Sequence, residues 1–185
     1  CWDYDVLRVL SAHVDSGEPL PPAEFARLEA SRLFLGASRM LSTARYALID
    51  MALHMGSVGD AQALEAQVLD TWSIRARDER AQVLPGFSHI FAGGYAAGYY
   101  AYQWAEMLSA DAFAALKEAG QTLAEQRSRS LDFRRHVLAS GGAESMTVSF
   151  ERFRGRAPDL AHLLAAYGIT APMLEGAKCE QPSMV

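Results

Sequence analysis

Cysteine is scarce in this sequence of 185 residues. The two cysteines, Cys1 and Cys179, lie near opposite ends of the chain, and no Cys-x-x-Cys pair is present. A disulfide framework and a zinc knuckle both need several cysteines at suitable spacings, so the sequence offers neither. We therefore expect the chain to work in a reducing compartment, the cytoplasm.

Long apolar runs and clusters of basic residues are also missing. No apolar stretch approaches the roughly 18 residues of a membrane span, and the first residues do not resemble a signal peptide. The chain carries 17 basic and 22 acidic residues, for a formal net charge of −5 at pH 7. This balance argues against a nucleic-acid surface, and we expect neither a nucleic-acid nor a membrane partner.

Apolar residues recur at helical spacing along most of the chain, and no strand-length alternation competes with them. Pro22 and Asp60 are well placed to start helices. Residues 25–55 form one long periodic stretch, which Gly36 interrupts without clearly breaking. The other expected helices are 2–14, 60–72, 94–108, 109–120, 131–138, 149–153 and 158–168. The sequence predicts a single all-α domain over residues 1–169, followed by a polar, flexible tail at 170–185.

The most unusual stretch is "HIFAGGYAAGYYAY", residues 89–102, with one histidine, three glycines and four tyrosines. On a helix with about 100° per residue, Tyr95, Tyr99, Tyr102 and Glu106 share one face. The tyrosines are then either amphipathic core residues whose hydroxyls reach the surface, or phenols that line a cleft and donate hydrogen bonds to a carbonyl or an oxyanion. Spacing alone leaves both interpretations open.

The residues that precede these tyrosines allow the same two interpretations. Gly93 and Gly94 either let the backbone approach a ligand closely or simply form a turn. His89 is either a hydrogen-bond donor to that ligand or an ordinary hydrogen-bonded residue.

Several segments together resemble one family. "FSHIFAGGYAAGYYAYQWAEMLSADAF" is similar to a stretch of the thimet oligopeptidase family of zinc metallopeptidases, which includes oligopeptidase A and bacterial dipeptidyl carboxypeptidases. "FRRHVLASGG", "FERFRGRAPDLAHLLAAYGI" and "GEPLP" resemble other segments of the same proteins. The resemblance covers about residues 1–169 and implies a mostly helical enzyme whose deep channel admits short peptides.

The resemblance also implies roles for individual residues. In this family a zinc ion polarises the scissile carbonyl and activates water, with a glutamate as general base. Carried onto this chain, the pattern implies a substrate-facing trio of His89, Tyr95 and Tyr102, with Tyr102 or Tyr95 as the oxyanion donor. Tyr99 lies on the same face, and Gly93 and Gly94 would form a mobile loop over the substrate.

The zinc motif itself is missing from the sequence. H-E-x-x-H needs two histidines four residues apart, and none of His13, His54, His89, His136 and His162 fits it. In the family this motif and a third ligand, a glutamate, lie upstream of the position of Cys1. The resemblance thus implies the C-terminal part of a catalytic domain, which binds no metal alone and needs the upstream part of the same domain as its partner.

Two features favour a different outcome. Without zinc ligands, the chain alone is expected to be inactive toward peptides. In addition, "VLPG" runs directly into Phe87, where the family usually carries a longer loop. The alternative to a piece of a zinc oligopeptidase is therefore a non-catalytic helical module that binds peptides or partners, or a degenerate fragment derived from that family.

Overall fold

A computed structural model describes residues 2–56, 59–72, 82–120 and 122–169. The predicted tail at 170–185 lies outside these residues. Every regular element in the described part is helical, which confirms the all-α class. The helices are α1 (Tyr4–Leu10), α2 (Pro22–Leu33), α3 (Gly36–His54), α4 (Ala61–Thr71), α5 (His89–Ala92), α6 (Ala101–Glu118), α7 (Leu123–Phe133), α8 (Met146–Arg154) and α9 (Ala161–Ala166), with a 3₁₀ turn η1 (Leu84–Gly86) and a π-helical turn η2 (Arg134–Leu138).

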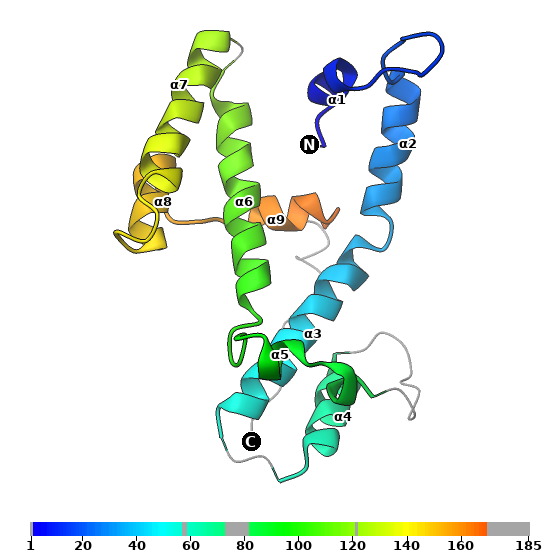
Figure 1. The fold of residues 1–185 in the computed structure, drawn as a ribbon, viewed down its shortest axis with the longest axis vertical. Helices are drawn as coiled ribbons and strands as arrows, with labels where there is room; N and C mark the ends of the chain where they lie inside the picture. The colour runs from blue at the N-terminus through cyan, green and yellow to red at the C-terminus, as the bar shows by residue number, and fades with distance from the viewer. Residues whose placement is uncertain (1, 57–58, 73–81, 121, 170–185) are drawn as a thin grey trace.

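The helices form a fork with two arms (Figure 1). Helices α1 and α2 make one arm, and α6, α7 and α8 make the other. Helix α3 runs from the first arm to the base, where α4 and α5 lie, and α9 crosses the space between the arms and contacts α6. None of these helices is long and apolar enough to cross a membrane, as far as the described residues extend.

Local capping chemistry explains several of the helix starts. Helix α2 begins at Pro22, as predicted, because proline has its backbone angle preset for a first helical turn. The Asp60 carboxylate accepts hydrogen bonds from the amides of Gln62 and Ala63, which confirms it as the cap of α4. A reciprocal capping box between Thr122 and Glu125 starts α7 earlier than the sequence predicted.

Two predicted helices in the first part of the chain are wrong in their extent. The first helix ends at Leu10, because the His13 ring accepts hydrogen bonds from the amides of Asp15 and Ser16 and favours a turn there. The stretch 25–55 is two helices, since Leu35 adopts a left-handed conformation with φ of 54°. Gly36 lies against the carbonyl of Tyr167, where any Cβ would collide, so α9 can pack directly on this break.

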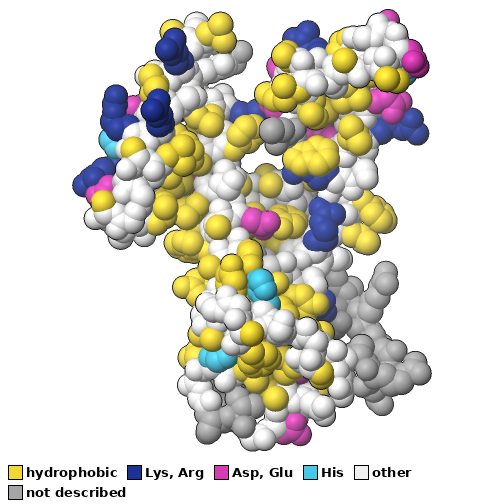
Figure 2. All heavy atoms as spheres, in the orientation of Figure 1, with side chains coloured by type: hydrophobic (Ala, Val, Ile, Leu, Met, Phe, Trp, Pro, Cys, Tyr) yellow, Lys and Arg dark blue, Asp and Glu magenta, His cyan; other side chains and the backbone are white. Residues whose placement is uncertain are grey.

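The buried apolar residues form two separate clusters. In one arm, Ala112 and Ala115 of α6 pack against Phe150 and Phe153 of α8. At the base, the second cluster joins α3, η1 and α5 through Ile49, Leu84 and Ile90. Many other large apolar side chains stay exposed over both arms (Figure 2). Polar contacts therefore carry much of the connection between the elements.

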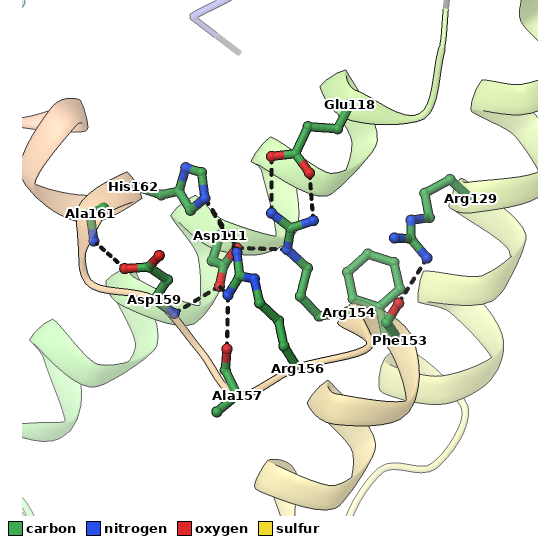
Figure 3. Close-up of polar contacts among 10 residues, drawn as sticks. All are labelled: Asp111, Glu118, Arg129, Phe153, Arg154, Arg156, Ala157, Asp159, Ala161 and His162. Atoms are coloured by element: carbon green, nitrogen blue, oxygen red, sulfur yellow. Dashed lines mark hydrogen bonds and ion pairs between the residues drawn. The ribbon is translucent and has the colours of Figure 1, made fainter.

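The strongest of these contacts surrounds Asp111 of α6, which is fully buried (Figure 3). Its carboxylate accepts hydrogen bonds from Arg154 Nε at 2.7 Å, from two nitrogens of Arg156 at 2.7 and 2.8 Å, and from the amide of Asp159 at 2.8 Å. His162 Nε2 lies 3.5 Å away. One carboxylate thus holds the whole connection between α8 and α9.

The pKa of Asp111 depends on two opposing effects, its burial and its hydrogen bonds. Burial alone would raise it, but the hydrogen bonds from Arg156 and Arg154 outweigh burial and lower the pKa to about 2. A lowered pKa means that the charged form contributes stability above the ordinary value of 3.8, and that this contribution is lost as pH falls through about 2.

We predict that Asp111→Asn lowers the free energy of unfolding by about 3 kcal/mol at pH 7, because it leaves the two arginines without their shared partner. Urea unfolding followed by circular dichroism measures the loss. The gap between wild type and variant should shrink as pH falls from about 4 to about 2, where the wild-type carboxyl also becomes neutral.

Asp132→Asn is the matched control. Asp132 pairs with Arg135 at 3.5 Å on the surface, so its replacement should cost less than about 0.5 kcal/mol. Equal losses in the two variants, or a gap that stays constant down to pH 2, would contradict the assignment of Asp111 as the anchor.

Candidate functional site

The backbone that carries the tyrosines is anchored by Asp50 of α3. This side chain is 1% exposed, and its two oxygens accept hydrogen bonds from the amides of Ala97 and Tyr99, both at 2.9 Å. The ring of His54 contacts the same carboxylate at 2.9 Å. The sequence analysis missed this residue. Its signal is a carboxylate in the middle of the apolar run "ALIDMAL", where a charge is unexpected without buried partners.

Asp50 also explains why the predicted helix 94–108 is wrong in its first part. Helix α6 begins only at Ala101, and residues 95–100 form a series of turns. Ala97 has a positive φ of 54°, a conformation that costs free energy for a residue other than glycine. The two hydrogen bonds from backbone amides to the Asp50 carboxylate stabilise this turn instead of the helix.

Although the helix is absent there, the turn still brings the predicted residues together. The rings of His89 and Tyr95 stack with their centroids 4.5 Å apart. The Tyr95 and Tyr102 rings stack at 5.4 Å, and the Tyr99 ring meets Tyr102 edge-on at 5.1 Å. We call His89, Tyr95, Tyr99 and Tyr102 the phenol cluster.

The cluster is held by a short polar contact. His89 Nε2 lies 2.8 Å from the Tyr102 hydroxyl. A hydrogen bond with the Tyr95 hydroxyl, and then partial burial, raise the pKa of Tyr102 above its ordinary value of 10.0. Tyr102 therefore keeps its proton throughout the neutral range and remains a hydrogen-bond donor.

The tyrosines of the phenol cluster do not share one environment. Tyr99 packs edge-on against Phe87 at 5.2 Å and joins the apolar cluster at the base. Burial, with a smaller effect of Tyr46, raises the pKa of Tyr99. Tyr102, by contrast, is 39% exposed. Tyr99 is thus more enclosed than Tyr102, and both line the pocket described below.

Gly93 and Gly94, which lie between His89 and Tyr95, are each required by the backbone for a different reason. A Cβ at Gly93 would lie 2.6 Å from the carbonyl oxygen of His89, too close for any other residue without movement. Gly94 has a φ of +77°, which side chains disfavour. These constraints explain the glycine pair without a ligand, and the predicted mobile loop over a substrate stays a prediction.

An open pocket of about 430 Å³ adjoins the phenol cluster. Its lining includes His89, Tyr99 and Tyr102 together with Thr43, Phe87 and Glu106. Glu106 lies one turn beyond Tyr102 on α6, and its carboxylate accepts a hydrogen bond from the Tyr167 hydroxyl at 2.8 Å. Burial and then this carboxylate raise the pKa of Tyr167 to about 12. The pocket wall therefore combines phenols, an imidazole and one carboxylate.

A metal ion finds no ligand set in the described part of the chain. No three histidine, cysteine, aspartate or glutamate side chains gather there in an arrangement that could hold one. The residues present therefore do not fit the zinc site that the resemblance implies, and we assign them no metal-dependent step.

The fold and site define an all-helical protein with a tyrosine-rich pocket preceded by a glycine turn. Comparison with known families matches residues 1–169 to Peptidase family M3, and the chain belongs to this family. The chain is similar to oligopeptidase A of Escherichia coli (strain K12), with 38% identity over 173 residues, 91% of this chain and 25% of that protein.

Two further relatives show how broadly the similarity extends. "Probable cytosolic oligopeptidase A" of Arabidopsis thaliana is 37% identical over 181 residues, covering 92% of this chain and 25% of that protein. A dipeptidyl carboxypeptidase of Salmonella typhimurium is 35% identical over 173 residues, with 89% and 24% covered. The chain thus spans about a quarter of the length of the curated relatives it matches.

We predict that Asp50→Asn speeds amide hydrogen exchange at Ala97 and Tyr99 by about tenfold or more, because an asparagine offers one acceptor oxygen where the carboxylate offers two. Exchange measured residue by residue by NMR tests this. Glu65→Gln is the matched control, since the buried Glu65 carboxylate accepts from the amides of Val83 and Leu84. That variant should speed exchange at 83 and 84 only. Unchanged protection at 97 and 99 in Asp50→Asn would contradict the anchoring role.

Proposed function

We propose that the phenol cluster binds short peptides and donates a hydrogen bond to the oxyanion that forms when a peptide bond is hydrolysed. The observation that carries this proposal is the contact of 2.8 Å between His89 Nε2 and the Tyr102 hydroxyl, at the wall of an open pocket. Membership of Peptidase family M3 and the similarity to proteins named oligopeptidase A support the reaction class.

Tyr102 is the proposed oxyanion donor. Its phenol is accessible and protonated at neutral pH, since its pKa lies above the ordinary value of 10.0. A donor that is already oriented stabilises developing negative charge without a cost of reorganisation. In the proposed arrangement His89 carries its proton on Nε2 and donates it to the Tyr102 oxygen, which leaves the phenol proton free for the oxyanion. Tyr95, stacked on His89, supplies a second hydroxyl to the peptide.

The rest of the catalytic apparatus is proposed to come from outside this chain. Zinc, held by the upstream part of the same domain, is the cofactor, and the cytoplasm is the compartment. The exposed apolar residues of α1 and its following turn support a contact with further parts of the domain, since Val9, Leu10 and Val14 are 77%, 71% and 92% exposed. Apolar surface of this kind favours burial against a partner.

We predict that Tyr102→Phe lowers kcat by more than about tenfold and changes KM little, because the phenol acts in the transition state rather than in the bound peptide. The measurement is hydrolysis of an internally quenched fluorescent peptide by the natural polypeptide that contains this sequence, in the presence of zinc. The phenylalanine keeps the stacked ring and removes only the hydroxyl.

Tyr100→Phe is the matched control, because Tyr100 is half-exposed and does not line the pocket. It should leave both kcat and KM unchanged. An unchanged kcat in Tyr102→Phe would refute the oxyanion role. Peptide binding without any hydrolysis by the wild-type protein would instead support the alternative of a non-catalytic peptide-binding module.

A further inference from the structure

A second, larger pocket of about 680 Å³ lies between the two arms of the fork. Its walls come from Trp2, α2, the start of α3, α6 and α9, and include the aromatic side chains Phe113 and Tyr167. Glu106 lines this pocket as well as the pocket of the phenol cluster. The two pockets therefore share a wall residue, and Figure 2 shows a hollow between the arms.

Basic side chains dominate the charge of this pocket, and most of them have partners. Arg39 donates to the carbonyl oxygens of Phe34 and Arg32. Lys117 pairs with Asp3 at 2.8 Å, and His162 lies beside the Asp111 carboxylate. These three side chains are engaged within the chain.

Arg32 is different. Its Nε is buried without a hydrogen-bond partner, and its guanidinium has no ion pair with any residue that the structure describes. Its contact is with the Trp2 ring, whose centroid lies 5.4 Å from the guanidinium carbon. Arg32 lines the pocket, and a guanidinium presents a planar fork of donors that matches a carboxylate. No residue that the structure describes supplies Arg32 with an anionic partner.

We propose that Arg32 binds a carboxylate of the peptide, either its C-terminal carboxylate or an acidic side chain. Trp2 holds the guanidinium by stacking, so the fork is ordered before the peptide arrives. Glu106, between the phenol cluster and Arg32, repels a carboxylate that stops short of this position. This inference rests on the proposed function, because it assigns a specificity residue to the same peptide site.

Three hydrolysis-resistant pentapeptides of one sequence test the proposal. The first has a free C-terminal carboxylate and no acidic side chain, the second is its C-terminal amide, and the third is the amide with one residue replaced by glutamate. Isothermal titration of the natural polypeptide at pH 7 should show one of the two carboxylate peptides binding about tenfold or more tightly than the uncharged amide. The tighter peptide identifies the source of the carboxylate.

Arg32→Gln should reduce the affinity of that peptide to the affinity of the amide and leave the amide unchanged. Arg27→Gln is the matched control on the same helix, because Arg27 is 79% exposed and pairs with Glu24 at the surface. It should keep the full difference between the peptides. A circular dichroism spectrum confirms that both variants are folded.

Two results would overturn the inference. The first is that all three peptides bind the wild-type protein with equal affinity. The second is that the difference in affinity between the carboxylate peptide and the amide remains in Arg32→Gln. If the peptides bind equally and Tyr102→Phe still lowers kcat, only the carboxylate site fails. If none of the three peptides binds, the proposed peptide site fails together with it.

Discussion

The position of the phenol cluster depends on one buried carboxylate. Asp50 accepts hydrogen bonds from the backbone amides of Ala97 and Tyr99, and these two bonds hold the segment before α6 in a turn. A helix would place the tyrosines on one face at a regular rise, which separates their rings along its axis. The turn instead folds Tyr95 back onto His89, so that the rings stack and the Tyr102 hydroxyl reaches the imidazole.

The same device recurs at two other connections. The Glu65 carboxylate of α4 accepts hydrogen bonds from the amides of Val83 and Leu84. The Asp111 carboxylate of α6 accepts one from the amide of Asp159, in the segment between α8 and α9. A buried charge is costly unless it is fully hydrogen-bonded, so each of these carboxylates strongly favours the one backbone arrangement that satisfies it. Because the apolar clusters are small and separate, this directional bonding determines where the connecting segments lie.

The distance along the sequence between interacting residues explains which features of the structure could be predicted from the sequence. Asp60 and Pro22 start helices through contacts with their own first turns, so the signal is local and both predictions are confirmed. Family resemblance and helical spacing together selected the phenol cluster, and the structure does bring its rings together. The turn at 95–100 was missed because its partner, Asp50, lies 47 residues earlier. Nothing local in "RGRAPD" identifies Asp111 as the partner of its arginines. Likewise, nothing local indicates that the Tyr167 carbonyl, at the end of α9, packs against Gly36.

Helix α6 links these constraints to the proposed chemistry. Its first residues follow the turn that Asp50 anchors, and its second half carries Asp111, which holds the segment leading to α9. Between these two points lies Glu106, and α9 returns Tyr167 to donate to its carboxylate. Helix α6, which forms the wall shared by the two pockets, is therefore held by two buried carboxylates. Asp50 of α3 anchors the turn before it, and Asp111 within it anchors the segment that leads to α9. Tyr102 and Glu106 lie one turn apart on α6, so a displacement of either anchor would change how both lie relative to His89 and Tyr167. The pocket geometry therefore depends on α3 and on the arm that contains α6, as well as on the glycine turn beside the phenols.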